Sequence, residues 1–319
     1  MHELEFRQRY AGLLIIGDPH LEARKPGFRK DDYPRTILNK LTWLLDYAQR
    51  KNFFPLILGD LFHLPRNNPN WLLVEIIRLF VNPIAGIYGN HDVHENVINS
   101  DDSISVIAEA SNLHLLDEQL CLRLNIEDMP VLIGGTPWGR KLPDKLRLED
   151  RKEAGFVLWL AHHDLKVPGY EEQGWLKPKE LPGIDVVVNG HIHRNLEPLR
   201  KKGTLWLTPG NISRRSRGDA VREHVPSALV IHFLRGRPVT EYVEVPHEPF
   251  DTVFYPQAVS EDLRIAGSAF VDGLSELQAR RTESGEGLNY FLEKNLGQFE
   301  SDVAEEIQKL AREVLQNGE

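Results

Sequence analysis

The chain has 319 residues, of which 41% are hydrophobic and 27% are charged, which is ordinary for a globular protein. No apolar run approaches the roughly 20 residues that cross a membrane, and a single cysteine, Cys121, excludes an intramolecular disulfide and a thiolate metal cage. The polar start of the chain is not typical of a signal peptide, so we expect a cytoplasmic protein with one large or two smaller domains.

The first half of the chain alternates apolar runs with helical patterns. Strands are expected at 11–17, 54–58 and 84–88, and helices at 33–50 and 71–80. This alternation predicts parallel βαβ units. Further along, shorter strand-like runs take over at 120–124, 131–134, 156–161, 184–188, 204–207, 228–233 and 239–245. The step at 200–203 (RKKG) predicts a hairpin turn between two of these runs.

The composition changes near residue 245, which indicates how the chain is divided. We expect one domain at 1–245, a linker at 246–258 and an acidic helical region at 259–319. Apolar residues recur along one face of the last helix: Leu292, Leu296, Phe299, Val303, Ile307, Leu310 and Val314. This stripe either packs on the chain's own domain or docks a partner, and the pattern leaves both interpretations open.

Five short polar segments directly follow apolar, strand-like runs. They are Asp18-Pro19-His20, Gly59-Asp60-Leu61-Phe62-His63, Gly89-Asn90-His91-Asp92, His162-His163 and Gly190-His191-Ile192-His193. In open α/β sheets, ligands bind beyond the carboxyl ends of the strands, so we expect the five segments to converge. A glycine before Asp60, Asn90 and His191 permits a tight turn at each.

The side chains of these segments form a set of oxygen and nitrogen donors without sulfur, which suits Mn²⁺, Fe or Zn²⁺ better than Ca²⁺. Their number predicts two divalent ions that share Asp60. Such a shared carboxylate holds two ions about 3.5–4 Å apart, the arrangement that activates water against phosphate esters. One ion is assigned to Asp18, His20, Asp60 and His193, and the other to Asp60, Asn90, His162 and His191.

The order D-x-H, GD, GNHD, H and GH-x-H resembles the calcineurin-like metallophosphoesterases over residues 13–210. The resemblance implies a four-layer α-β-β-α sandwich, here with a C-terminal helical extension. It also implies the metal roles given above, and it favours His162 over His163 as the ligand. Singly, each motif could be a turn or a capping sequence, but five of them in order are specific.

A finer resemblance points to SbcD-type nuclease subunits of DNA-repair complexes, especially their short, phage-like forms. The segment 59–63 (GDLFH) matches a form seen in that group, and 208–211 (TPGN) resembles its PGS loop, with Asn211 in place of serine. The resemblance implies that His63 and His91 handle the scissile phosphate, with His91 as general acid. It also implies a Mn²⁺-dependent DNA exo/endonuclease that works with an SbcC-like SMC-type ATPase, docked through the C-terminal helices. A homodimer and a phage origin are left open.

Basic and acidic residues are unevenly distributed along the chain, whose net charge is −9. Residues 191–240 hold ten Lys/Arg against three Asp/Glu, whereas 241–319 hold six against seventeen. The basic stretch is either a solvated hairpin and loop or a surface for nucleic-acid phosphates. Its place after the last histidine motif favours phosphate contact, with Arg194, Arg214, Arg215 and Arg217 as the candidate residues.

Two other functions remain open from the sequence. The first is a phosphodiesterase or phosphatase for nucleotides or other small molecules, which the acidic net charge favours slightly. The second is a non-catalytic adaptor on the same fold, which the complete donor set disfavours. Trp138 either stacks on a base or packs in its loop. Asp92 either orients His91 or bonds within its turn.

Overall fold

The computed structural model describes residues 2–168, 170, 174–216 and 222–255. The chain divides into two units, 1–255 and 256–319. Only the first unit contains described residues, so the acidic helical region expected at 259–319 and its apolar stripe lie outside them. Within the stretch expected as a linker, α6 (Phe250–Val253) forms a short helix, and Val253 and Phe254 are buried.

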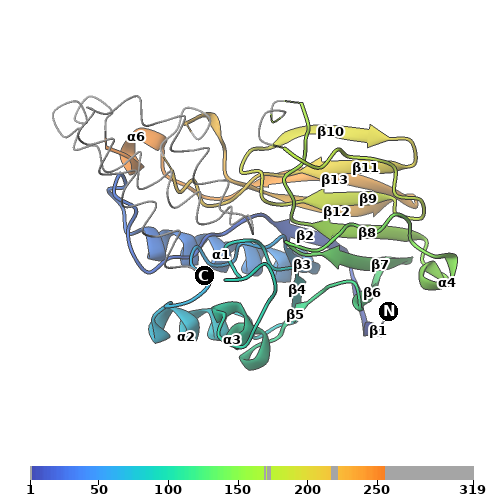
Figure 1. Ribbon diagram of the computed structural model, residues 1–319, viewed down its shortest axis with the longest axis horizontal. Helices are drawn as coiled ribbons and strands as arrows, with labels where there is room; N and C mark the ends of the chain where they lie inside the picture. The colour runs from blue at the N-terminus through green and yellow to red at the C-terminus, as the bar shows by residue number, and fades with distance from the viewer. Residues whose placement is uncertain (1, 169, 171–173, 217–221, 256–319) are drawn as a thin grey trace, which may run out of the picture. The chain divides into compact units, whose positions relative to one another are not determined.

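Two β-sheets form the centre of the first unit (Figure 1). The six-stranded sheet has the order β13-β12-β2-β3-β4-β5, and β2 to β5 run parallel. Its strands are β2 (Gly12–Ile16), β3 (Phe53–Ile57), β4 (Ile84–Gly86), β5 (Leu113–Leu115), β12 (Ser227–Leu234) and β13 (Arg237–Glu244). The parallel βαβ units predicted from the first half of the sequence are therefore confirmed.

The second sheet has seven strands in the order β1-β6-β7-β8-β9-β11-β10. They are β1 (His2–Tyr10), β6 (Leu120–Ile126), β7 (Met129–Thr136), β8 (Phe156–Ala161), β9 (Val186–Asn189), β10 (Leu196–Lys201) and β11 (Thr204–Thr208). Strands β7, β8, β9 and β11 run parallel, so their carboxyl ends share one edge. β10 and β11 pair in an antiparallel manner and are joined by the hairpin turn predicted at 200–203.

Alternating side chains of the central strands bury both faces of the six-stranded sheet. Leu13 and Ile15 lie in the core between the two sheets, together with Leu158 and Val188 of the second sheet. Leu14 and Ile16 point the other way, into a core covered by helices. A strand that is buried on both faces must be almost continuously apolar, which explains the unbroken apolar run at its position in the sequence.

Helices cover the outer face of the six-stranded sheet. They are α1 (Tyr33–Lys51), α2 (Asn70–Leu79) and α3 (Ser103–Ala110). The outer face of the second sheet packs against loops and the short α4 (Leu148–Arg151), with Trp159 and Trp206 in that core. The expected layered α/β sandwich is thus confirmed, although loops make up most of its fourth layer in the described part of the chain. None of the described helices combines the length and apolar character that crossing a bilayer requires.

Helix α1 begins and ends where local chemistry requires. The Asp32 side chain accepts a hydrogen bond from the Arg35 backbone amide at its start. At its end, Asn52 adopts a left-handed conformation, and its backbone N–H bonds the last carbonyls. The apolar face predicted for this helix is buried, and the helix carries an unexpected buried lysine on that side.

That lysine, Lys40, fastens α1 to the segment that follows β11. The residue is 4% exposed, and its ammonium donates a hydrogen bond of 2.6 Å to the carbonyl of Ile212. Burial, together with the positive charges of Arg214 and Arg29, lowers the pKa of Lys40 to about 7. The unfolded chain, where the lysine is solvated, therefore binds more protons than the native state between about pH 7 and the ordinary lysine pKa.

We expect Lys40→Met to flatten the pH dependence of stability. Below about pH 7, the native protein must bury a protonated Lys40, and this lowers its unfolding free energy. As pH rises from 7 toward 10.5, the cost decreases, because the buried amine is already neutral and the unfolded chain becomes less protonated at this lysine. The unfolding free energy of the native protein should thus gain on the order of 3–5 kcal/mol over this range relative to the variant. Urea unfolding at several pH values measures it, with the exposed Lys51→Met as control. Parallel pH profiles for native protein and Lys40→Met would contradict the shift.

Candidate metal centre

The five polar segments meet at one edge of the two sheets, beyond the carboxyl ends of β2, β3, β8 and β9 and beside the loop after β4. Four of the predicted ligands have positive φ angles: Asp18 (37°), His20 (49°), Asp60 (48°) and His191 (69°). Non-glycine residues seldom adopt this left-handed conformation, and such strain concentrates at functional sites. The backbone thus turns sharply at each of these donors and aims its side chain inward.

Two glycines allow these loops to approach one another closely. Gly59 has φ of 97°, and a Cβ there would lie 2.6 Å from Nδ1 of His162. Gly89 does not need a positive φ, but a Cβ at this position would lie 2.1 Å from Oδ1 of Asp60. At Gly89 the requirement is therefore space for the Asp60 carboxylate rather than the turn predicted from the sequence.

One donor group consists of His20, Asp60 and His193, whose ligand atoms all lie within 4.8 Å of one another. The Nε2 atoms of the two histidines are 2.9 Å apart, and Nε2 of His20 is 3.5 Å from Oδ2 of Asp60. Oδ2 of Asp18 lies 3.9 Å from Nε2 of His193. The structure thus brings together all four residues that the sequence assigned to the first ion.

The second donor group consists of Asp60, His162 and His191. Nε2 of His162 lies 3.3 Å from Oδ2 of Asp60 and 3.3 Å from Oδ1 of Asn90. Nδ1 of His191 lies 2.9 Å from the same Asn90 oxygen. Asp60 is common to both groups, as the sequence predicted, and the structure places His162 in the group rather than His163.

The pattern of unpaired atoms tests whether a cation fits here. Within the described part of the chain, both carboxylate oxygens of Asp18, Oδ2 of Asp60 and Nδ1 of His20 are buried without a hydrogen-bond partner. His162 is oriented by a bond of 2.6 Å between its Nδ1 and the carbonyl of Leu58, so its Nε2 faces two oxygen acceptors. Buried acceptors that face one another require positive charge between them, and these residues therefore fit divalent ions.

The pKa values of Asp18, Asp60 and His162 are shifted because these groups are buried close to one another. Burial raises the pKa of Asp18 well above its usual range. Burial would also raise the pKa of Asp60, but positive charge on His162 holds that pKa well below its usual range. Burial would lower the pKa of His162, yet the carboxylates of Asp60 and Asp18 raise it to about 9. A proton on His162 offsets some of the carboxylate charge, which is the role that a divalent cation would also serve.

His63 and His91 lie beside the shared aspartate, as the resemblance implies. Their rings stack with centroids 4.7 Å apart, and the His20 ring meets that of His91 edge-on at 4.8 Å. Nδ1 of His91 lies 2.8 Å from the carbonyl of His63, so it carries the proton of the neutral ring and donates it there. Burial lowers the pKa of both His63 and His91. Nε2 of His91 is thus the nitrogen left for a substrate.

Two residues whose roles the sequence left open support the loops of the cluster. The Asp92 carboxylate accepts hydrogen bonds from the backbone amides of Leu61, Phe62 and Gly89, so it fixes the loop that carries Asp60 rather than orienting His91. Burial and the Asp60 charge raise the pKa of Asp92 to about 7. Trp138 stacks on the His191 ring, with centroids 5.1 Å apart, and its indole N–H bonds Asn96.

The four candidate arginines are placed differently from one another. Arg215 bonds Glu22 at 3.0 Å, and its charge lies close enough to contribute to the lowered pKa of His63 and of His91, behind burial. Arg214 is 5% exposed and donates to the carbonyl of Glu248, so the structure places it in the interior. Arg194 is half-buried, and Arg217 lies outside the described residues.

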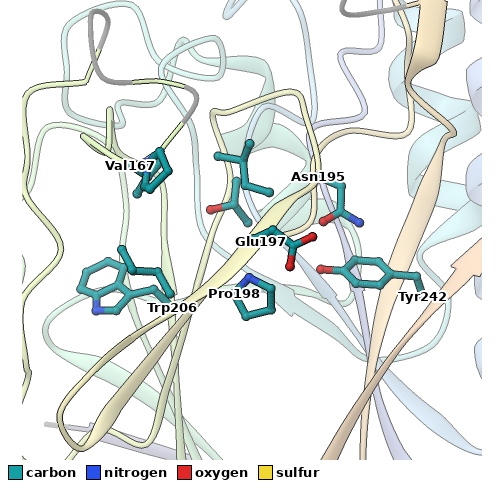
Figure 2. Close-up of a pocket in the computed structure, with 10 residues that line it drawn as sticks. Val167, Asn195, Glu197, Pro198, Trp206 and Tyr242 are labelled. Atoms are coloured by element: carbon teal, nitrogen blue, oxygen red, sulfur yellow. The ribbon is translucent and has the colours of Figure 1, made fainter.

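A separate pocket of about 520 Å³ lies along β10 (Figure 2). It is lined by residues of β10 and β11, by Tyr242 of β13 and by the loop at Val167 and Pro168. Glu197, Asn195, Tyr242 and Thr208 carry polar side-chain atoms in its lining, and the Trp206 indole supplies an apolar wall. None of the donors described above lines this pocket, so it is not part of the candidate metal centre.

A sequence profile of the calcineurin-like phosphoesterases matches residues 12–195, more than half of the chain, and these include every donor of both groups. No curated protein matches the chain.

The solved structures that match this chain are distant from it in sequence. A hypothetical protein from Thermus thermophilus is 16% identical, with 74% of this chain and 100% of that chain covered and a TM-score of 0.44. A conserved uncharacterized protein from Streptococcus pneumoniae, a predicted phosphoesterase, is 12% identical, with 77% and 94% covered and a TM-score of 0.34. Vacuolar Protein Sorting 29 from Cryptosporidium parvum is 16% identical, with 74% and 99% covered and a TM-score of 0.31.

We expect Mn²⁺ to stabilise the protein against heat through the shared aspartate. Because an ion that binds only the native state adds about 2.7 kcal/mol at a hundredfold excess over its Kd, the unfolding midpoint should rise by roughly 5 °C. Asp60→Asn removes the charge common to both groups and should abolish this rise. Calorimetry with and without Mn²⁺ measures the effect, with the exposed Asp144→Asn as control. An equal rise in Asp60→Asn would show that the ions bind elsewhere.

Proposed function

Because the chain belongs to the calcineurin-like phosphoesterase family, whose fold implies metal-dependent hydrolysis of phosphoesters, we propose that it hydrolyses the phosphodiester backbone of DNA. One observation carries the catalytic part of the proposal: two groups of donors, each with two buried members, share the buried carboxylate of Asp60. A structural role does not need this arrangement, because buried polar groups in a scaffold are normally paired with one another.

The donors divide between two ions. Asp18, His20, Asp60 and His193 would hold one, and Asp60, Asn90, His162 and His191 the other. When bound, a pair of divalent ions supplies Lewis acidity, which lowers the pKa of water and neutralises charge on phosphate oxygens. The nitrogen and oxygen donors suit Mn²⁺, and also Fe or Zn²⁺.

The chain's own residues supply the proton for the leaving oxygen. The carbonyl of His63 fixes the His91 ring through Nδ1, so Nε2 is the nitrogen that can carry a proton to the substrate. The His63 ring stacks on His91 and limits how that ring can turn. When a phosphate of the substrate lies beside His91, its negative charge raises the pKa of the ring and favours a second proton on Nε2. His91 is thus the general acid of the proposed reaction, and His63 holds it in place.

DNA as the substrate is supported by the segment Gly59–His63, which resembles SbcD-type nucleases, and by an arginine whose charge affects the pKa of both histidines. Arg215 places positive charge beside His63 and His91, where the phosphate of a scissile link would lie. Cations beside a cleft attract the nucleic-acid backbone without regard to sequence. Docking to an SMC-type ATPase through 259–319 is part of the same proposal and rests on the sequence alone.

The substrate class is tested by comparing two diesters in the presence of Mn²⁺. We expect the full-length protein to degrade end-labelled linear duplex DNA and also to hydrolyse bis-p-nitrophenyl phosphate, and Asp60→Asn to do neither. Adding the SMC-type ATPase should accelerate only the first reaction. Hydrolysis of the small diester without DNA cleavage would indicate a small-molecule phosphodiesterase instead. Inactivity on both diesters would favour a non-catalytic adaptor.

The acid role of His91 is tested by the leaving group. On DNA, where a poor alkoxide leaves, His91→Asn should lower kcat by roughly 10²–10⁴-fold. On bis-p-nitrophenyl phosphate, whose phenolate leaves without a proton, the loss should be less than about tenfold because an acid contributes little to such a step. Equal losses on both substrates would mean that His91 binds the phosphate rather than protonating the leaving oxygen.

A further inference from the structure

Asp164 contacts the metal centre from outside the five predicted motifs. Its Oδ1 lies 2.8 Å from Nε2 of His191, and both side chains are about 15% exposed. The other ring nitrogen of His191, Nδ1, lies 2.9 Å from Oδ1 of Asn90, inside the second donor group. The histidine is therefore held between a carboxylate on one side and the candidate ligands on the other.

We propose that Asp164 is a positioning residue that sets the tautomer of His191 and so makes Nδ1 its metal-binding nitrogen. An ionised carboxylate accepts hydrogen bonds and donates none, so Nε2 of His191 must carry the ring proton toward Asp164. The lone pair of the neutral ring is then on Nδ1. Without Asp164, the proton could move to Nδ1, where it would satisfy Asn90 and block coordination.

The ring of His191 is fixed in a second direction by stacking. The Trp138 indole lies over it at an interplanar angle of 27°, and that indole is held in turn by its bond to Asn96. Asp164 directs the ring edge and Trp138 supports the ring face. Partners of this kind around a metal-binding histidine typically contribute a factor of about 10–100 in ion affinity.

The backbone around Asp164 is anchored on both sides, as a positioning residue requires. On one side, the Asn189 side chain accepts from the amide of His163 and donates to its carbonyl, which ties this segment to the end of β9. On the other side, the Asp164 carbonyl accepts hydrogen bonds from the amides of Trp175 and Leu176. The carboxylate is thus presented by a loop that is tied to the same strand end as His191.

The first arm of the test measures the tautomer with no metal added. Selective ¹⁵N-histidine labelling distinguishes a protonated Nε2 from a protonated Nδ1, and comparison with His191→Gln assigns the signal. We expect the native protein to show the Nε2–H form, and Asp164→Ala to show a substantial Nδ1–H population. Should Asp164→Ala not fold, Asp164→Leu, which keeps a side chain of similar size but offers no acceptor to Nε2, replaces it. An unchanged tautomer in the variant would overturn the inference.

The second arm measures ion binding by calorimetric titration with Mn²⁺ and rests on the proposed function. We expect two ions in the native protein, and in Asp164→Ala one ion with unchanged affinity and a second with affinity reduced by roughly 10–100-fold. Asp144→Ala, which removes an exposed carboxylate, should bind as the native protein does. Two unaltered affinities in Asp164→Ala would overturn the inference and leave the proposed function intact. No binding by the native protein would overturn the proposed function, while the tautomer would still decide the role of Asp164.

Discussion

The carboxylate of Asp60 is the constraint on which the rest of the site depends. One buried oxygen, Oδ2, lies 3.5 Å from Nε2 of His20 and 3.3 Å from Nε2 of His162, and it has no hydrogen-bond partner in the described part of the chain. Both carboxylate oxygens of Asp18 are buried and unpaired nearby as well. Such buried acceptors repel one another unless positive charge lies between them, so bringing them together costs free energy. The layers of the fold supply the free energy that holds this arrangement, since the donors follow strands whose apolar side chains fill three cores.

Because packing of the strands holds the site together, the donors can adopt a strained, left-handed backbone conformation. The strands before them are buried on both faces, so their ends are fixed by packing on either side of the sheet. A rigid strand end can force the next residue into a left-handed conformation that it would not adopt alone. Asp92 and Asn189 continue this support into the loops through hydrogen bonds to backbone groups. The packing of apolar strand residues thus fixes the strand ends, and hydrogen bonds then fix the loops that carry the donors.

Sequence reasoning succeeded where the signal was local. Apolar runs such as 156–161 predicted strands directly, and the residues after them predicted the donors. It missed β1, whose polar alternation resembles a loop, as well as α3 and β10, whose short, mixed segments have weak periodicity. Asp164 was missed because its importance arises from a contact with His191, 27 residues away, which no motif contains. The interior position of Arg214 likewise depends on the segment before α1, where Arg29 donates to its carbonyl, and on the segment after β13, which the run of arginines does not reveal.

The left-handed backbone at Asp18, His20, Asp60 and His191 also limits how this centre can change during evolution. Asparagine and glycine tolerate that conformation, whereas valine, isoleucine and threonine do not. Loss of the donors through asparagine or glycine would therefore leave the sandwich intact, while a β-branched replacement would disturb the turn itself. A few substitutions to asparagine or glycine would thus be enough for a descendant of this chain to lose its metal donors and keep its fold.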